Sequence, residues 1–251
     1  MNIFGIKDSA NFTVKYKSGT NKGKIFVYSD YATVATNEWT SSQVYAKSKN
    51  VNAIRWDYDR AGTLKADMEI FDLKWIGMLF GTEFVSGDKE VLKREALAVV
   101  EAESAKTVTM VGTPVVGSMS VYVLDDDNLS NKTELVATTD YSISGNVITI
   151  TNDEVKAGDK IAVFYLEAKT GAKTLTISAD KYPDNFEVFA DTAIRDLNGV
   201  DQFVQIHYLN VKPKSQFTLT LDAANITKLS IEFDILKDSA SNDMAEYTIY
   251  E

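Results

Sequence analysis

The sequence has no cysteine, and only one histidine, His207, and three prolines among its 251 residues. Without cysteine the chain forms no disulfide and has no thiol for catalysis, a composition typical of proteins made in a reducing compartment. A single histidine excludes sites in which several histidines bind one metal, and a histidine-based triad would depend on His207 alone. Between Ile206 and Tyr208, this histidine is most simply a strand residue.

Long hydrophobic runs and an excess of positive charge are also absent. No apolar run approaches the roughly 20 residues of a membrane-spanning helix, and the start, MNIFGIKDSANF, does not resemble a secretory signal. Residues 1–100 carry 14 basic and 12 acidic side chains, whereas residues 101–251 carry 12 and 24. An acidic protein repels nucleic acid at long range, which argues against a protein that grips DNA or RNA. A protein past which nucleic acid slides without sticking remains compatible with this charge.

Acidic side chains supply the remaining candidates for chemistry, and each has a simpler interpretation. Residues 125–128 (DDDN) offer oxygen ligands for calcium but lack the glycine and terminal glutamate of a helix-loop-helix site, which favours a solvated turn. Asp57 with Asp59, and Asp67 with Glu69, have the spacing of carboxylate pairs on one strand face, which is common on any solvated sheet. No phosphate loop, dinucleotide-binding glycines or nucleophile elbow occurs. We therefore predict no catalytic residue, no metal and no cofactor.

Residues 62–81, GTLKADMEIFDLKWIGMLFG, are the stretch around which we expect the chain to be organised. Their first part alternates as a strand does, because successive side chains of an extended chain point to opposite sides. The apolar side comprises Leu64, Ala66, Met68 and Ile70, and the other side Lys65, Asp67, Glu69 and Phe71.

The second part of this stretch changes to helical spacing. Asp72 is suited to cap a helix N-terminus, and Gly81 can end the helix in a left-handed conformation. Leu73, Ile76 and Phe80 recur at helical intervals, and the segment is apolar nearly all round. We predict a short buried helix that packs through these three residues.

The strand that precedes residue 62 and the strand that follows it are predicted to form a two-stranded ribbon with one polar face. Residues 53–58 alternate, a polar loop is expected at 37–42, and 59–62 (DRAG) is typical of a hairpin turn leading into the next strand. We predict that one face of the resulting ribbon, over 53–71, meets water and carries a mixture of charges. The predicted residues on this face are Arg55, Asp57, Lys65, Asp67 and Glu69.

Residues 105–170 predict a small antiparallel β unit of short strands and turns, inserted into a larger discontinuous domain of residues 1–104 and 171–251. The segment 91–100 favours a strand over a helix. Outside the unit, a turn is expected at 195–199 and strands are expected at 25–35, 174–177, 202–209, 217–221, 229–235 and 245–250. The expected class is mostly β: two packed antiparallel sheets, as a sandwich or partly closed barrel, with one short flanking helix.

The order of these parts resembles that of bacteriophage tail tube (major tail) proteins. The resemblance is carried by the ribbon AIRWDYDRAGTLKADMEIFD, the helix LKWIGMLFG, the block DYSISGNVITITNDEVKAGDKIAVFYLEAK and the terminal VKPKSQFTLTLDAANITKLSIEFDILKD. It spans about half of the chain or more through loose patterns of hydrophobicity and turns. The segment 105–170 departs from it, because the simplest tube proteins are shorter.

The resemblance implies a structural subunit without enzyme activity, whose homohexameric rings stack into a tube around a channel for DNA. It implies location in the virion tail after synthesis in the host bacterial cytoplasm, and no membrane partner. The implied partners are copies of the chain itself and tail proteins such as a sheath, tape measure or terminator, with DNA only in transit. Arg55, Asp57, Lys65, Asp67 and Glu69 would then line the channel.

Two other interpretations stay open. One is the inner tube of a contractile bacteriocin or secretion apparatus, which shares the fold but carries no DNA. The other is a β-sandwich module or adhesin that binds carbohydrate through aromatic residues such as Trp39, Tyr45 and Trp56, although aromatic residues in strands more often pack in a core.

Overall fold

A computed structural model describes residues 3–6, 8–102, 105–124, 132–216, 218 and 222–250. Over these residues the chain is mostly β, with antiparallel sheets, one helix and no closed barrel, as the sequence predicts. It divides into two compact units: unit 1 comprises residues 1–84 and 175–251, and unit 2 comprises residues 85–174. The candidate calcium-binding turn at 125–128 and most of the expected strand at 217–221 lie outside the described residues.

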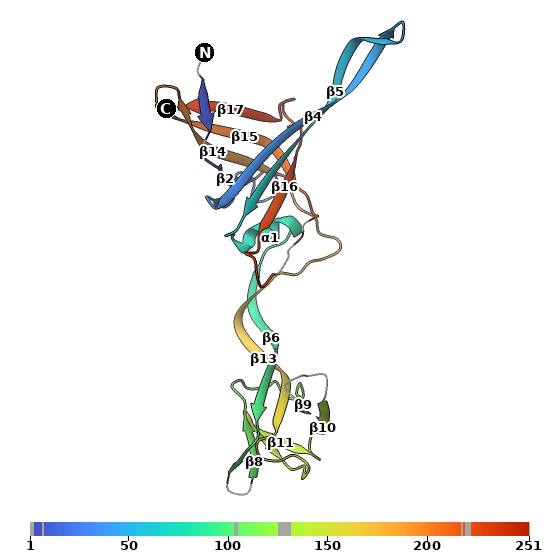
Figure 1. Cartoon of the computed structure of the whole chain (residues 1–251), viewed down its shortest axis with the longest axis vertical. Coiled ribbons are helices and arrows are strands. Elements are labelled where there is room, and N and C mark those ends of the chain that lie inside the picture. Colours follow the sequence, from blue (N-terminus) through green and yellow to red (C-terminus); the bar gives the residue numbers. More distant parts are fainter. Residues whose placement is uncertain are drawn as a thin grey trace. The chain divides into compact units, whose positions relative to one another are not determined.

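Unit 1 contains a nine-stranded sheet with the order β3-β2-β14-β15-β16-β5-β4, in which β1 also pairs with β14 and β17 with β15 (Figure 1). Strand β15 pairs with β17 through residues 203–208 and with β16 through residues 211–213, so the sheet forks there. Its elements are β1 (Phe4–Ile6), β2 (Asn11–Tyr16), β3 (Ile25–Ser29), β4 (Ala32–Ser48), β5 (Val51–Met68), α1 (Leu73–Phe80), β14 (Phe186–Asp196), β15 (Asp201–Pro213), β16 (Leu229–Ile235) and β17 (Ala245–Tyr250).

One hydrophobic core joins the strands on the two sides of β15. Phe12 and Val188, from β2 and β14 on one side, belong to the same buried cluster as Leu64, Met68 and Phe233, from β5 and β16 on the other. Every second residue of β16 is buried, from Leu229 to Ile235, as expected for a strand with one face on a core. The burial of these apolar side chains is the main contribution to the stability of unit 1.

Helix α1 has the ends that the sequence predicts. Asp72 is extended and its side chain accepts a hydrogen bond from the backbone N–H of Lys74, at 2.8 Å. Gly81 is left-handed with φ 61°, and its N–H bonds to the carbonyl of Met78. A side chain at Gly81 would collide with the backbone of Tyr182, so glycine is also required there for space.

Unit 2 consists of two four-stranded sheets, β10-β9-β13-β6 and β11-β12-β8-β7, around a second hydrophobic core. Its strands are β6 (Val85–Ala98), β7 (Val100–Ala102), β8 (Ala105–Thr109), β9 (Ser120–Leu124), β10 (Lys132–Leu135), β11 (Tyr141–Ser144), β12 (Val147–Ile150) and β13 (Lys160–Thr174). The unit starts at residue 85 instead of the expected 105, because β6 pairs with β13 along nearly its whole length. The expected strand at 174–177 is wrong beyond Thr174, where β13 ends.

The ribbon differs from its prediction in the position of its turn. Residues 37–42 lie within β4, and β5 runs through 59–62 without turning, so the predicted loop and turn are both wrong. The chain reverses at Lys49 and Asn50, which have φ angles of 49° and 68°. Two successive left-handed residues are what a two-residue hairpin turn requires, and asparagine tolerates that conformation better than most residues.

Candidate functional site

A solvated polar face covers the side of strands β16, β5 and β4 that is opposite the core. Lys65 lies between Thr36 on β4 and Glu232 on β16, and Asp67 lies beside Ser230. Asp67 accepts a hydrogen bond from the Ser230 hydroxyl and lies 3.5 Å from the Lys65 ammonium. The residues of this polar face are Thr36, Glu38, Thr63, Lys65, Asp67, Ser230, Glu232 and Asp234.

Further lysines border the polar face and pair with its carboxylates. Lys214 forms ion pairs with Glu232 and, at 3.5 Å, with Asp234, and its hydrogen bond to Glu232 raises the pKa of the ammonium group. Lys228 lies 3.0 Å from Glu69, just beyond the end of β5. The surface therefore interleaves three lysines with five carboxylates and presents no block of one sign.

A β-bulge in the ribbon places Arg55 and Asp57 on the other side. Thr40 lies opposite Ala61 but Ser42 lies opposite Tyr58, so β5 holds one residue more than β4 in this interval. Side chains alternate along a strand. One extra residue in β5 therefore places the side chains between the bulge and the hairpin turn on the opposite face from the one that their numbering predicts. The prediction that these two residues share a face with Lys65, Asp67 and Glu69 is therefore wrong.

Beyond the bulge the ribbon continues as an arm, which we define as residues 42–58. Figure 1 shows the arm extending beyond β16, which is the other strand that pairs with β5. Within residues 40–61, all side chains except Ala46 are exposed. An isolated two-stranded ribbon is at best marginally stable in water, so an arm exposed on both faces indicates a surface that receives a partner.

The two faces of the arm differ in chemistry. Val44 lies opposite Trp56 and Ala46 lies opposite Ile54, and these form an apolar stripe together with Tyr58. Val44, Ile54, Trp56 and Tyr58 are each about half exposed. The reverse face is polar: Arg55 pairs with Asp57 at 3.1 Å, and the Tyr45 hydroxyl donates to Gln43 at 2.7 Å.

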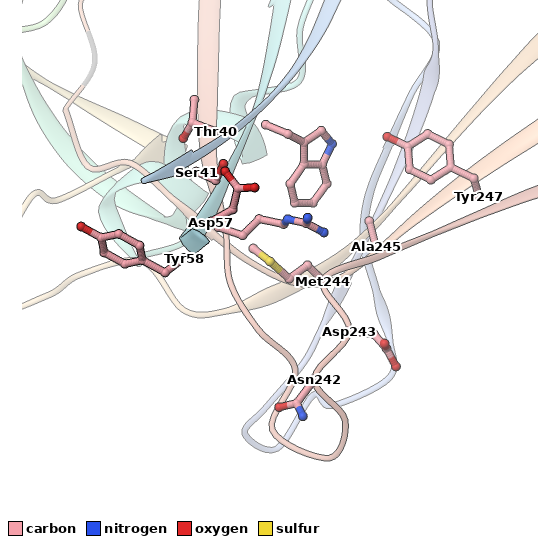
Figure 2. A pocket seen from close by; sticks show the side chains of 11 residues that line it. Thr40, Ser41, Asp57, Tyr58, Asn242, Asp243, Met244, Ala245 and Tyr247 are labelled. Carbon is pink, nitrogen blue, oxygen red and sulfur yellow. The ribbon is translucent and has the colours of Figure 1, made fainter. Parts of the chain in front are cut away.

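A groove of about 820 Å³ lies where the ribbon leaves the sheet, between the bulge and the segment that leads into β17 (Figure 2). Its lining combines aromatic surface with acidic, amide and guanidinium groups. The lining residues are Trp39, Thr40, Ser41, Asp57, Tyr58, Arg60, Asn242, Asp243, Met244, Ala245 and Tyr247. No sequence pattern predicted this groove, because residues 242–247 reach residues 39–60 only through the pairing of the whole sheet.

The wall of the groove at Trp39 is fixed by a glycine. The indole lies against Gly62 on the neighbouring strand, where a β-carbon would come within 2.7 Å of the ring. Asn37, two residues earlier on the same face, donates hydrogen bonds to the hydroxyls of Tyr208, at 2.5 Å, and Tyr247, at 3.3 Å. Burial raises the pKa of Tyr208, so this hydroxyl stays protonated across the physiological range.

The predicted helix contacts are only partly correct. Leu73 is 46% exposed, and Ile76 and Phe80 are half-buried, with Ile76 packed against the core. The buried side chains of α1 are instead Trp75, Met78 and Leu79. The prediction failed at Leu73 because a helix of eight residues covers the core with one side only.

Of the acidic candidates for chemistry, Asp57, Asp67 and Glu69 have ion-pair partners. His207 is a strand residue of β15, stacked on Phe189 at 4.1 Å between Glu187 and Glu246. Asp57 lines the groove, but Asp59, its partner in the predicted carboxylate pair, is not among the lining residues. In the described ranges, no three acidic or histidine side chains form a metal-binding group. Across the same residues, no helix is both long enough and apolar enough to span a membrane.

Comparison with known proteins identifies the family of the chain. The profile of the YomU/Tube protein family matches residues 4–249. A tail tube protein of Bacillus phage SPR is 29% identical over 193 residues, which cover 72% of this chain and 68% of that protein. The family match spans both units and nearly the whole sequence. The chain belongs to the YomU/Tube protein family, a phage tail tube family.

Proposed function

We propose that this chain is the structural subunit of a phage tail tube, in which rings of six copies stack around a channel for DNA. The observation that carries the proposal is the pair of surfaces on one ribbon: a solvated polar face at its base and an arm that is exposed on both sides. In a tube, the first would meet the channel and the second would meet other copies. Sheath, tape-measure and terminator proteins would be its further partners in the virion.

The polar face suits a channel wall because its charges are mixed. A wall with many unpaired lysines would bind phosphate groups and hold DNA, since release of counterions drives such binding. Here Lys65, Lys214 and Lys228 each have a carboxylate within ion-pair distance. In this proposal Lys65, Asp67 and Glu69 face the channel. Arg55 and Asp57 do not, because the bulge places them on the opposite face of the ribbon.

The apolar stripe of the arm would be covered by a neighbouring copy. Contacts between unlike surfaces of identical chains close into rings or continue into stacks, and a tube needs both. Burying Trp56 and Ile54 against another copy would remove from water two large apolar side chains that are about half exposed in the subunit. Unit 2, in this proposal, is a peripheral insertion, and replacing residues 85–174 by a short Gly/Ser linker leaves unit 1 folded.

Electron microscopy of concentrated purified protein tests the assembly. We expect rings or tubes, and we expect Trp56→Ser to raise the concentration needed for assembly at least tenfold with little change in the melting temperature of the monomer. A strict monomer at all concentrations contradicts the proposal. A monomer that binds oligosaccharides through the arm would support a carbohydrate-binding module instead.

The channel assignment has its own test in particles. Asp67→Lys combined with Glu69→Lys replaces two negative charges by two positive ones, a change of +4 in net charge per subunit, and we expect particles to assemble but to deliver DNA slowly, with recovery at higher salt. The matched control is Asp153→Lys with Glu154→Lys, two exposed neighbours in unit 2. Delivery that is unchanged by the first pair, or equally slowed by the second, removes the polar face from the channel.

A thiol placed at Asp67 measures access to the same face. Because the chain contains no cysteine, Asp67→Cys carries the only thiol. In assembled tubes, we expect small maleimides to react with it much faster than bulky ones. Equal reactivity toward both would place residue 67 on the outside.

A further inference from the structure

The groove at the base of the arm lacks a described function, and the tip of the arm lacks a described contact. We propose that the groove of one copy receives the hairpin turn of a second copy, residues 47–52, in a head-to-tail contact. This inference rests on the proposed tube function and deepens it by naming the receiving surface. Its basis is the groove geometry, the arm length and the charge of the two surfaces.

The geometry separates the two surfaces within one chain. Seven residues of β4, from Ser42 to Ser48, lie between the bulge and the turn, and at about 3.3 Å per residue they span roughly 23 Å. The turn therefore cannot reach the groove of its own chain, which opens at the base of the same arm. Contact between tip and base must involve two copies, and because the surfaces are unlike, a pair still has one free groove on one copy and one free tip on the other.

The chemistry of the turn matches that of the groove. Residues 43–54 (QVYAKSKNVNAI) contain two lysines and no acidic residue, and Lys47 and Lys49 are exposed. The groove presents the carboxylate of Asp243, which has no ion pair among the described residues, beside Arg60 and beside Asp57, whose carboxylate pairs with Arg55 at 3.1 Å. Oppositely charged patches attract across an interface and fix its register.

Aromatic surface in the groove favours a lysine-bearing strand in particular. A lysine stem packs along apolar surface while its ammonium group interacts with a ring face or a carboxylate. Trp39, held against Gly62, and Tyr247, held by Asn37, offer such faces beside Asp243. Val51, 68% exposed at the start of β5, would meet the same apolar wall. The groove thus provides both kinds of surface that the turn requires.

Disulfide trapping between two singly substituted chains tests this contact. Lys49→Cys and Asn242→Cys are made in separate chains, mixed, assembled and oxidised; neither chain has another thiol. We expect a mixed 49–242 dimer as the main product, because a disulfide forms only where the two α-carbons lie within about 7 Å. Ser18→Cys, an exposed turn residue of unit 1, replaces Asn242→Cys in the control and should give at least tenfold less mixed dimer.

Charge reversal tests the same contact without oxidation. Asp243→Lys should raise the concentration needed for assembly at least tenfold, and adding Lys49→Glu should restore it to within about threefold. Lys22→Glu, at an exposed turn elsewhere in unit 1, should give no rescue. Rescue by both glutamates, or by neither, overturns the contact.

The outcomes separate this inference from the proposed function. Rings or tubes that give only 49–49 dimers, or in which the thiol of the Asn242→Cys chain stays fully reactive to maleimide, overturn the groove contact and leave the tube role intact. Failure of every variant and of the unmodified protein to assemble overturns both.

Discussion

The two ends of the ribbon use the same pair of strands in different ways. At its base, Leu64, Ala66 and Met68 are buried in the core of unit 1 and every second side chain meets water. In the arm the alternation continues, but over the described residues both faces are exposed, and only Asp57 and Tyr58 at its base share a groove with residues 242–247. The difference indicates that the base is selected for the stability of the subunit, whereas the arm is selected for what it contacts outside it. Measurements that separate stability from assembly should therefore divide the ribbon at the bulge.

The largest expected effect compares one buried and one exposed residue of β5. Leu64→Ala removes a side chain that is 2% exposed, and should lower the free energy of unfolding by about 2–5 kcal/mol. Ile54→Ala, in the arm, should change it by less than about 0.5 kcal/mol. Urea unfolding followed by tryptophan fluorescence reports on unit 1 alone, because all three tryptophans lie there. Equal losses in the two variants would break the division at the bulge.

Helix α1 sharpens the comparison at the core of the base. Ile76 packs against that core, so Ile76→Asp places a charge beside buried apolar groups and should cost about 2–4 kcal/mol. Leu73→Asp, on the exposed side of the same helix, is the matched control and should cost less than about 1 kcal/mol. A melting temperature of Ile76→Asp that equals that of the unmodified chain would show that this side of the helix is free of the core.

A glycine substitution probes the boundary between base and arm. Gly62→Ala forces the Trp39 ring away from its neighbour and should cost about 1–3 kcal/mol, with a change in the tryptophan emission maximum. Gly5→Ala, on β1, where nothing lies within 4 Å of the added carbon, should leave both stability and emission unchanged. If Gly62→Ala behaves like Gly5→Ala, the wall of the groove is mobile and the ring is not fixed.

The smallest expected effect is on the pH dependence of stability. It contrasts the largely buried ion pair of Lys17 and Asp238 with the exposed pair of Arg55 and Asp57 on the arm. Asp238 lies 2.6 Å from Lys17 and accepts two backbone N–H groups; the hydrogen bond from Lys17 is the largest cause that lowers its pKa to about 2. A carboxyl whose pKa is lowered by folding stabilises the protein above its unfolded pKa, and this contribution is lost as the pH falls from about 4 toward 2.

Asp238→Asn should therefore flatten the dependence of unfolding free energy on pH in that interval. Asp57→Asn, which removes the exposed partner of Arg55 on the arm, should leave the pH dependence as it is. Acid titrations of stability at fixed salt make the comparison. Equal flattening by both substitutions would contradict it.

Local signals in the sequence were sufficient for elements whose ends depend on neighbouring residues. Asp72 and Gly81 fixed the ends of α1, and strict alternation identified β16. The hairpin turn was misplaced because Asp59-Arg60-Ala61-Gly62 has the composition of a turn, while Lys49-Asn50 reverses the chain without a glycine.

The surfaces were harder to predict than the strands. The side on which Arg55 and Asp57 lie depends on one residue inserted relative to β4, and periodicity within β5 alone cannot reveal it. The groove depends on pairing between β17 and β15, which brings residues 242–247 toward residues more than 180 positions earlier in the chain. Neither distance along the sequence nor composition carries that information.

The bulge beside Asp59 also constrains how related genes can change. Loss of one codon there would remove the extra residue of β5 and turn the distal half of that strand over relative to β4, exchanging Trp56 and Ile54 with Arg55 and Asp57. Loss of two residues from each strand would only shorten the arm, because the side-chain repeat of a strand is two residues. We therefore expect selection in this family to conserve the difference in length between the two strands of the hairpin more strictly than the identity of any side chain on them. Insertions should then accumulate as two residues in each strand, so that hairpins of several lengths present the same face.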